Sequence, residues 1–135
     1  MSAASNYLEN KVLDHVLTST GYTAPSTRYL ALFTNTSGSA ATNLEAGTLT
    51  DEVSGGSYAR QAVTFGGASS GTSATNATVT FPAATADWGT ITHVAVMDAS
   101  TSGNVLFWGA VTTSKTIQNG DTFQVSSGNL TVSLA

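Results

Sequence analysis

The residues that could act in catalysis or bind a metal are few and scattered along the chain. His15 falls beside an apolar helical stripe and His93 falls inside a predicted strand, so we interpret both as packing or surface histidines. Neither stands in a recognisable catalytic triad, and no GxSxG, HExxH, P-loop or EF-hand pattern occurs. The sequence therefore predicts a protein that is not an enzyme and has no cofactor or metal.

The carboxylates are also placed in structural positions. Asp51 and Glu52 form the only adjacent acidic pair, whereas Asp87, Asp98 and Asp121 fall at predicted strand ends or turns. Cleavage of a glycosidic bond needs two carboxylates held about 5 to 10 Å apart. Aspartates in turns usually accept hydrogen bonds from local backbone amides, and we favour that role here. A calcium site built from several of these loop aspartates is the alternative, and nothing in the sequence supports it.

The two tryptophans differ in context. Trp108 lies inside the strand-like run VLFWGAV, which indicates packing in the core. Trp88 lies at a strand entry between Asp87 and Gly89, where we expect a partly exposed ring. An exposed aromatic at a loop indicates a subunit contact, and a sugar-stacking platform is the alternative. We take Asp87, Trp88 and Gly89 as a candidate contact with another subunit.

The element that must position further contacts is an N-terminal helix, predicted over residues 5–18. Its apolar residues recur at helical spacing and form one stripe, with Asn6 as the expected N-cap and Glu9 three residues later. A single amphipathic helix is not stable alone, so this stripe must pack on the body of the protein or on a neighbouring subunit. The candidate contact residues in the stripe are Leu8, Val12, Leu13 and Val16, and Leu17 continues it.

The remainder, residues 28–134, has the period of β-strands. Residues 28–34 (RYLALFT) are apolar on both faces, which predicts a buried strand, and residues 35–49 and 66–76 are predicted loops. Further strands are expected at residues 58–65, 77–81, 90–98, 104–112, 116–118, 121–125 and 130–134, with an Asn119-Gly120 hairpin turn between the fifth and sixth of these segments. About seven or eight strands with closely spaced turns indicate one antiparallel β-sandwich domain over residues 1–135, either a jelly roll or another Greek-key arrangement.

Composition limits the possible partners. Only 9% of residues are charged, against about 25% in typical domains. The four basic residues are scattered, which excludes nucleic-acid binding as an expected function. There is no cysteine, and the apolar runs are far shorter than the roughly 20 residues of a membrane-spanning helix. The start of the chain lacks the pattern of a signal peptide, so we expect synthesis in the cytoplasm and no membrane partner.

Several motifs together resemble one known family. They are SNYLEN at residues 5–10, EVSGGSYARQAVTF at 52–65, FPAATADWGTITHVAVMD at 81–98, GNVLFWGAV at 103–111 and SKTIQNGDTF at 114–123. In order and spacing they are similar to small phage and prophage proteins often labelled tail-fibre proteins, among which we expect capsid decoration (cement) proteins. The resemblance covers most of the chain and implies a structural component of a phage virion, with no catalytic residues.

The place in the virion is then a physical question. A fibre spans distance through a coiled coil, a trimeric shaft or repeated elements, and this sequence shows no long heptad run and no repeat. We therefore expect a decoration protein on the outer capsid surface, a homotrimer that bridges subunits of the major capsid protein or contacts other virion proteins. The alternative is a tail-fibre or tail-tip protein that binds a host receptor or carbohydrate through its loops.

Overall fold

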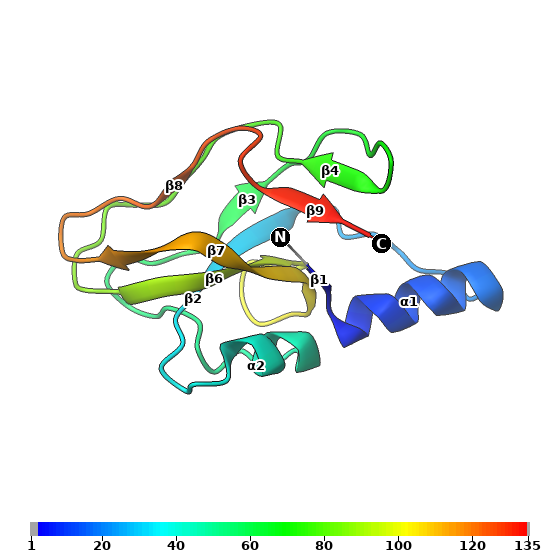
Figure 1. The fold of residues 1–135 in the computed structure, drawn as a ribbon, viewed down its shortest axis with the longest axis horizontal. Helices are drawn as coiled ribbons and strands as arrows, with labels where there is room; N and C mark the ends of the chain where they lie inside the picture. Colours follow the sequence, from blue (N-terminus) through cyan, green and yellow to red (C-terminus); the bar gives the residue numbers. More distant parts are fainter. Residues whose placement is uncertain (1–2, 135) are drawn as a thin grey trace.

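The central feature of the fold is an antiparallel sheet of five strands in the order β1-β7-β6-β2-β3 (Figure 1). The structure is a computed structural model, which describes residues 3–134. The strands of this sheet are β1 (Ala3–Ala4), β2 (Arg28–Phe33), β3 (Gln61–Val63), β6 (Gly89–Met97) and β7 (Val105–Ile117). The long strands β6 and β7 form a hairpin, with Val96 opposite Phe107 near its loop and Gly89 opposite Ile117 at its far end.

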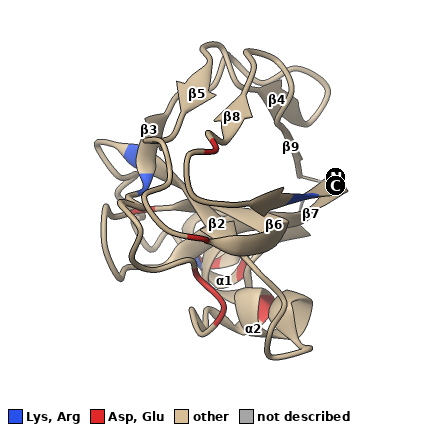
Figure 2. Ribbon diagram, turned by 90° about the vertical axis from the view of Figure 1, so that its left-hand side faces the viewer, with Lys and Arg blue, Asp and Glu red and all other residues tan. Residues whose placement is uncertain are grey.

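A second layer of short strands covers one face of this sheet. It consists of two ribbons, β4 (Thr72–Ala74) paired with β9 (Thr131–Ser133) and β5 (Val79–Thr80) paired with β8 (Gln124–Val125). Figure 2 shows the ribbons on one side of the sheet and helix α2 on the other. The predicted mainly-β sandwich with an N-terminal helix is thus confirmed. The second layer is not one continuous sheet, and the strand order does not establish a jelly roll.

Strand β2 shows why both faces of the sheet are covered. Leu30, Ala31, Leu32 and Phe33 are all fully buried, as the doubly apolar run predicts. Because side chains alternate across a strand, Leu30 and Leu32 join the core under the ribbons, whereas Ala31 and Phe33 join a smaller cluster with Leu44 of α2. The sheet therefore divides the protein into a large and a small core.

The N-terminal helix α1 (Asn6–Leu17) begins one residue later and ends one residue earlier than predicted. Its N-cap is Ser5 rather than Asn6. The Ser5 hydroxyl is buried, donates to the Val105 carbonyl, and accepts a hydrogen bond from the Leu8 amide at 3.3 Å. Tertiary structure decides the cap, because the Ser5 hydroxyl is buried beside β7 and gains a second partner there, whereas Asn6 is exposed.

A second helix, α2 (Ala40–Ala46), lies in the segment predicted as a loop. It buries only Ala40 and Leu44, so its seven residues carry no apolar stripe that a sequence pattern could detect. Gly47 ends it in the left-handed conformation, with φ of 83°, which glycine adopts without strain. The prediction of a loop here was wrong because the helix depends on tertiary contact rather than on its own periodicity.

Three strand predictions also need correction. The segments expected at residues 104–112 and 116–118 are one continuous strand, β7, and β4 lies within the predicted loop 66–76. The turn at Asn119-Gly120 does not form the expected hairpin, since β8 pairs with β5. The backbone amide of Gly120 instead donates to the Ala84 carbonyl at 2.7 Å, and the amide of Ala84 donates to the Asp121 carbonyl at 2.9 Å. This turn is therefore bound to the segment before β6.

Candidate interaction surfaces

The adjacent acids Asp51 and Glu52 are both engaged in internal hydrogen bonds. The Asp51 carboxylate is buried and accepts from the Ser37 hydroxyl at 2.5 Å, the Ser37 amide at 3.0 Å and the Thr36 hydroxyl at 3.2 Å. These bonds, above all that from the Ser37 side chain, hold the pKa of Asp51 below its ordinary value. Asp51 thus fixes the loop that leads from β2 into α2.

Glu52 forms a two-pronged ion pair with Arg60. The Nε and Nη2 groups of Arg60 donate hydrogen bonds to Oε2 and Oε1 of Glu52, both at 2.7 Å. The Tyr58 hydroxyl also donates to Glu52 Oε2, at 2.8 Å. The remaining Arg60 nitrogen, Nη1, donates to the carbonyls of Ala99 and Ser102 at 2.8 Å. The hydrogen bond to Glu52 raises the pKa of Arg60, which stays charged. This cluster holds the β6–β7 loop against the start of β3.

The histidines occupy structural positions. His93 is half-buried, its Nδ1 lies 2.8 Å from the Thr92 hydroxyl, and its ring centre lies 6.3 Å from that of Trp108. Burial lowers the pKa of His93. His15 is exposed, and its Nδ1 lies 3.2 Å from the Thr20 carbonyl. Within residues 3–134 there is no group of three or more histidine, aspartate or glutamate side chains that could hold a metal ion.

Trp88 is a core residue, contrary to the expectation of an exposed ring. Its side chain is 5% exposed, its Nε1 donates to the Gly56 carbonyl at 2.9 Å, and it meets Tyr58 edge-on at 5.5 Å between ring centres. A side chain at Gly56 would clash with the indole, so the Gly55-Gly56 turn is what admits the ring. Trp88 is therefore available neither as a subunit contact nor as a sugar-stacking platform.

The neighbours of Trp88 also serve the fold. The Asp87 carboxylate accepts a hydrogen bond from the Asn119 amide at 2.9 Å, across the open end of the β6–β7 hairpin. Gly89 begins β6 with φ of 87°, a conformation that favours glycine. Asp87 and Gly89 are exposed, so their contact with another subunit stays a prediction.

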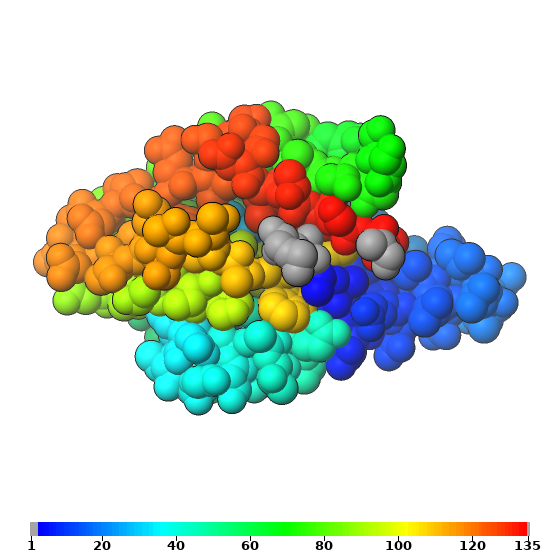
Figure 3. Space-filling view, in the orientation of Figure 1, coloured from blue at the N-terminus to red at the C-terminus, as the bar shows by residue number. Residues whose placement is uncertain are grey.

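The apolar stripe of α1 is divided between two environments. Leu8 is buried in the large core and Val12 is packed against that core, so the inner part of the stripe is a structural anchor. Beyond Val12 the side chains lie in water: Leu13 is 55% exposed, Val16 70% and Leu17 74%. We call these three residues the helix ridge. Figure 3 shows the outer part of α1 projecting beyond the rest of the molecule.

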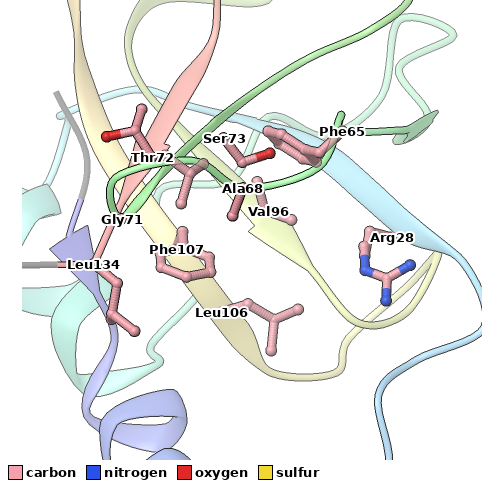
Figure 4. Close-up of a pocket in the computed structure, with 11 residues that line it drawn as sticks. Arg28, Phe65, Ala68, Gly71, Thr72, Ser73, Val96, Leu106, Phe107 and Leu134 are labelled. Carbon is pink, nitrogen blue, oxygen red and sulfur yellow. The ribbon is translucent and has the colours of Figure 1, made fainter.

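A second apolar surface lies at the mouth of the sandwich. A pocket of about 260 Å³ opens between the main sheet and the β4–β9 ribbon, and we call it the sandwich pocket. Figure 4 shows Phe107 and Leu134 on one side of this space and Arg28 on the other. Its apolar walls come from Phe65, Val96, Leu106, Phe107, Val132 and Leu134. Leu134 is 55% exposed, and the large hydrophobic residues exposed within residues 3–134 are this one and the helix ridge.

The structure thus separates the predicted contact residues. Leu13 and Val16 lie on an open surface, whereas Leu8 and Trp88 lie in the core. Asp87 and Gly89 lie at the open end of the β6–β7 hairpin. The pocket residues were missed as a site, although residues 130–134, which include Val132 and Leu134, were predicted as a strand. Arg28 carried no signal in the sequence, because its position at the pocket follows from strand pairing.

Comparison with known families is decisive for the class of protein. Residues 3–133 match the family model described as Podophage GP4 fiber I protein gp80 (Gp80). The chain belongs to this family. A comparison with curated proteins finds no match. Membership of the Gp80 family makes the chain a phage virion protein of the fibre type, as the sequence motifs indicated, and the family description favours the tail-fibre alternative over capsid decoration. Of the helices in residues 3–134, none has the length and apolar character needed to span a membrane.

Proposed function

We propose that this chain is a non-catalytic structural subunit of a phage tail fibre. The observation that carries the proposal is the match to the fiber I family over residues 3–133, a range that includes α1, the main sheet and both ribbons. The match thus involves the fold as a whole rather than one motif within it. Capsid decoration lacks comparable support.

The internal chemistry of the molecule supports a structural role. The groups that a hydrolase would need are already engaged: Asp51 binds the loop before α2, Glu52 binds Arg60, and Asp87 binds the turn after β7. Across residues 3–134, every buried side-chain nitrogen or oxygen has a hydrogen-bond partner. A fully partnered interior favours one rigid conformation, which suits a particle component that transmits force.

The exposed helix ridge supports a role in assembly. Three large aliphatic side chains side by side on a protruding helix are unusual for a protein that works as an isolated monomer. We expect the partners to be other copies of this chain, in a homotrimer or another oligomer, together with neighbouring virion proteins. Such repeated contacts let a compact domain contribute to an extended fibre.

Imaging of particles that lack the protein tests this assignment. Virions made without the chain and virions complemented with it in trans would be compared by cryo-electron microscopy and by adsorption to host cells. We expect the deletion to remove density at the tail, leave the head shell unchanged, and lower adsorption. Loss of density confined to the head shell would overturn the tail-fibre assignment in favour of decoration.

A further inference from the structure

We propose that the helix ridge of one copy inserts into the sandwich pocket of a second copy, so that subunits join head to tail. The contact pairs the exposed ridge Leu13, Val16 and Leu17 with the pocket beside Leu134. It rests on the proposed function only in that a fibre contains several copies of the chain. Association in solution tests it regardless of where those copies lie in the particle.

The part of α1 that carries the helix ridge is helical, although the rest of the chain does not cover its apolar side chains. An isolated helix of about 12 to 15 residues is marginal in water, and α1 has 12 residues of which only Leu8 is fully buried. Its outer end is instead closed locally: the Thr18 amide and hydroxyl both donate to the Asp14 carbonyl, at 3.0 and 2.6 Å. Local capping keeps the ridge in a shape that a partner can bind.

The pocket fits the ridge in size and polarity. A cavity of about 150 Å³ lined by aliphatic and aromatic side chains can hold a benzene ring. The sandwich pocket has about 260 Å³ and is lined mainly by side chains of that kind, so it has room for more than one leucine-sized group. The ridge does not fill the pocket of its own chain, since its three residues remain 55 to 74% exposed.

Charge complementarity favours a second copy as the occupant. Arg28 lines the pocket, and within residues 3–134 no side-chain carboxylate forms an ion pair with it. Glu9 is exposed and lies one helical turn before Leu13, on the same side of α1 as the ridge. A ridge seated in the pocket therefore brings the Glu9 carboxylate toward a guanidinium that pairs with no other side-chain carboxylate of the described residues.

The two surfaces of this contact are different, so the interface is heterologous. After one pairing the pair of copies keeps one free ridge and one free pocket, so the series closes into a ring or grows into a filament. The homotrimer expected from the sequence is one such ring. An isologous dimer, in which two ridges pack on each other, would leave the pockets empty and has a different response to mutation.

Two variants separate these possibilities. The ridge variant carries Leu13→Ser, Val16→Ser and Leu17→Ser, and its control carries Lys11→Ser, Asp14→Ser and His15→Ser on other faces of the helix. The pocket variant carries Ala68→Trp, which fills the pocket from an exposed loop, and its control carries Ala83→Trp on an exposed loop elsewhere. Circular dichroism and thermal unfolding would establish that each variant is folded.

Light scattering and native mass spectrometry would then measure association. We expect the wild-type chain and both controls to form oligomers, and each variant alone to be monomeric, with the Kd raised at least about a hundredfold. A mixture of the two variants should give a one-to-one dimer, because one copy retains its pocket and the other its ridge. A wild-type chain that stays monomeric at about 1 mM overturns the contact. So does a folded pocket variant that assembles normally, or a mixture that forms no dimer.

Discussion

The cluster around Arg60 and the outer half of α1 differ in which side chains are exposed to solvent. Around Arg60, charged and aromatic groups are covered and each buried polar atom has a partner, with the Arg60 side chain only 3% exposed. On the outer half of α1, aliphatic groups that would stabilise any core lie in water. The first region is complete within one chain, whereas we propose that another molecule covers the second.

We therefore expect the Arg60 cluster to determine folding stability and the helix ridge to determine association between molecules. Substitutions around Arg60 should lower the free energy of unfolding. They should not change the affinity between copies that are folded. Substitutions on the helix ridge should leave the folded chain intact and change association.

Replacing Arg60 with methionine should destabilise the chain by about 3 to 5 kcal/mol. Removal of one partner of a buried ion pair leaves the other charge uncompensated, and here Glu52 would lose both guanidinium bonds. The measurement is chemical denaturation followed by tryptophan fluorescence. The control is Arg28→Met, which removes a half-buried arginine that has no ion pair within residues 3–134. Measured below the concentration of oligomer formation, it should cost less than about 1 kcal/mol. Equal losses at both positions would contradict the special role of the Arg60 cluster.

The two ends of α1 should respond differently to truncation of a leucine. Leu8→Ala should cost about 2 to 5 kcal/mol, because Leu8 is 7% exposed and packs in the large core. Leu17→Ala should change monomer stability by no more than about 0.5 kcal/mol, because Leu17 is 74% exposed. Unfolding would be measured at a protein concentration below that of oligomer formation. A large loss for Leu17→Ala under those conditions would place it in the core of the monomer.

The smallest expected effect is the acid sensitivity contributed by Asp51. Its pKa is lowered in the folded chain, so the folded state binds a proton less readily than the unfolded state. The stabilisation is present above the unfolded pKa of about 3.9 and is lost as the pH falls through the lower folded value. Asp51→Asn and Ser37→Ala should both flatten the decline of unfolding free energy below about pH 4. Unchanged acid profiles in both variants would show that these hydrogen bonds do not favour the ionised carboxylate.

The candidate sites were only partly accessible from the sequence. The helical stripe predicted an apolar face that needed a partner, and Leu13 and Val16 are indeed open. The spacing of apolar residues could not show which of them the rest of the chain covers. Leu8 was therefore grouped with Leu13 and Val16, although it lies in the core. For Trp88, flanking turn residues suggested exposure, whereas the indole is enclosed by Gly56, Tyr58 and Phe81, which only the folded chain brings together.

By itself, the sequence determined the mainly-β class, the N-terminal helix, the doubly buried strand β2 and the phage virion family. Those properties follow from local periodicity and from motifs in fixed order, which a linear chain displays directly. Only the tertiary structure decided the cap at Ser5, helix α2, the pairing of β8 with β5 and the pocket beside Leu134. Each of these depends on which distant segments meet. The division of the apolar stripe into a buried anchor and an exposed ridge arises in the same way, because it depends on which residues of α1 the rest of the chain covers.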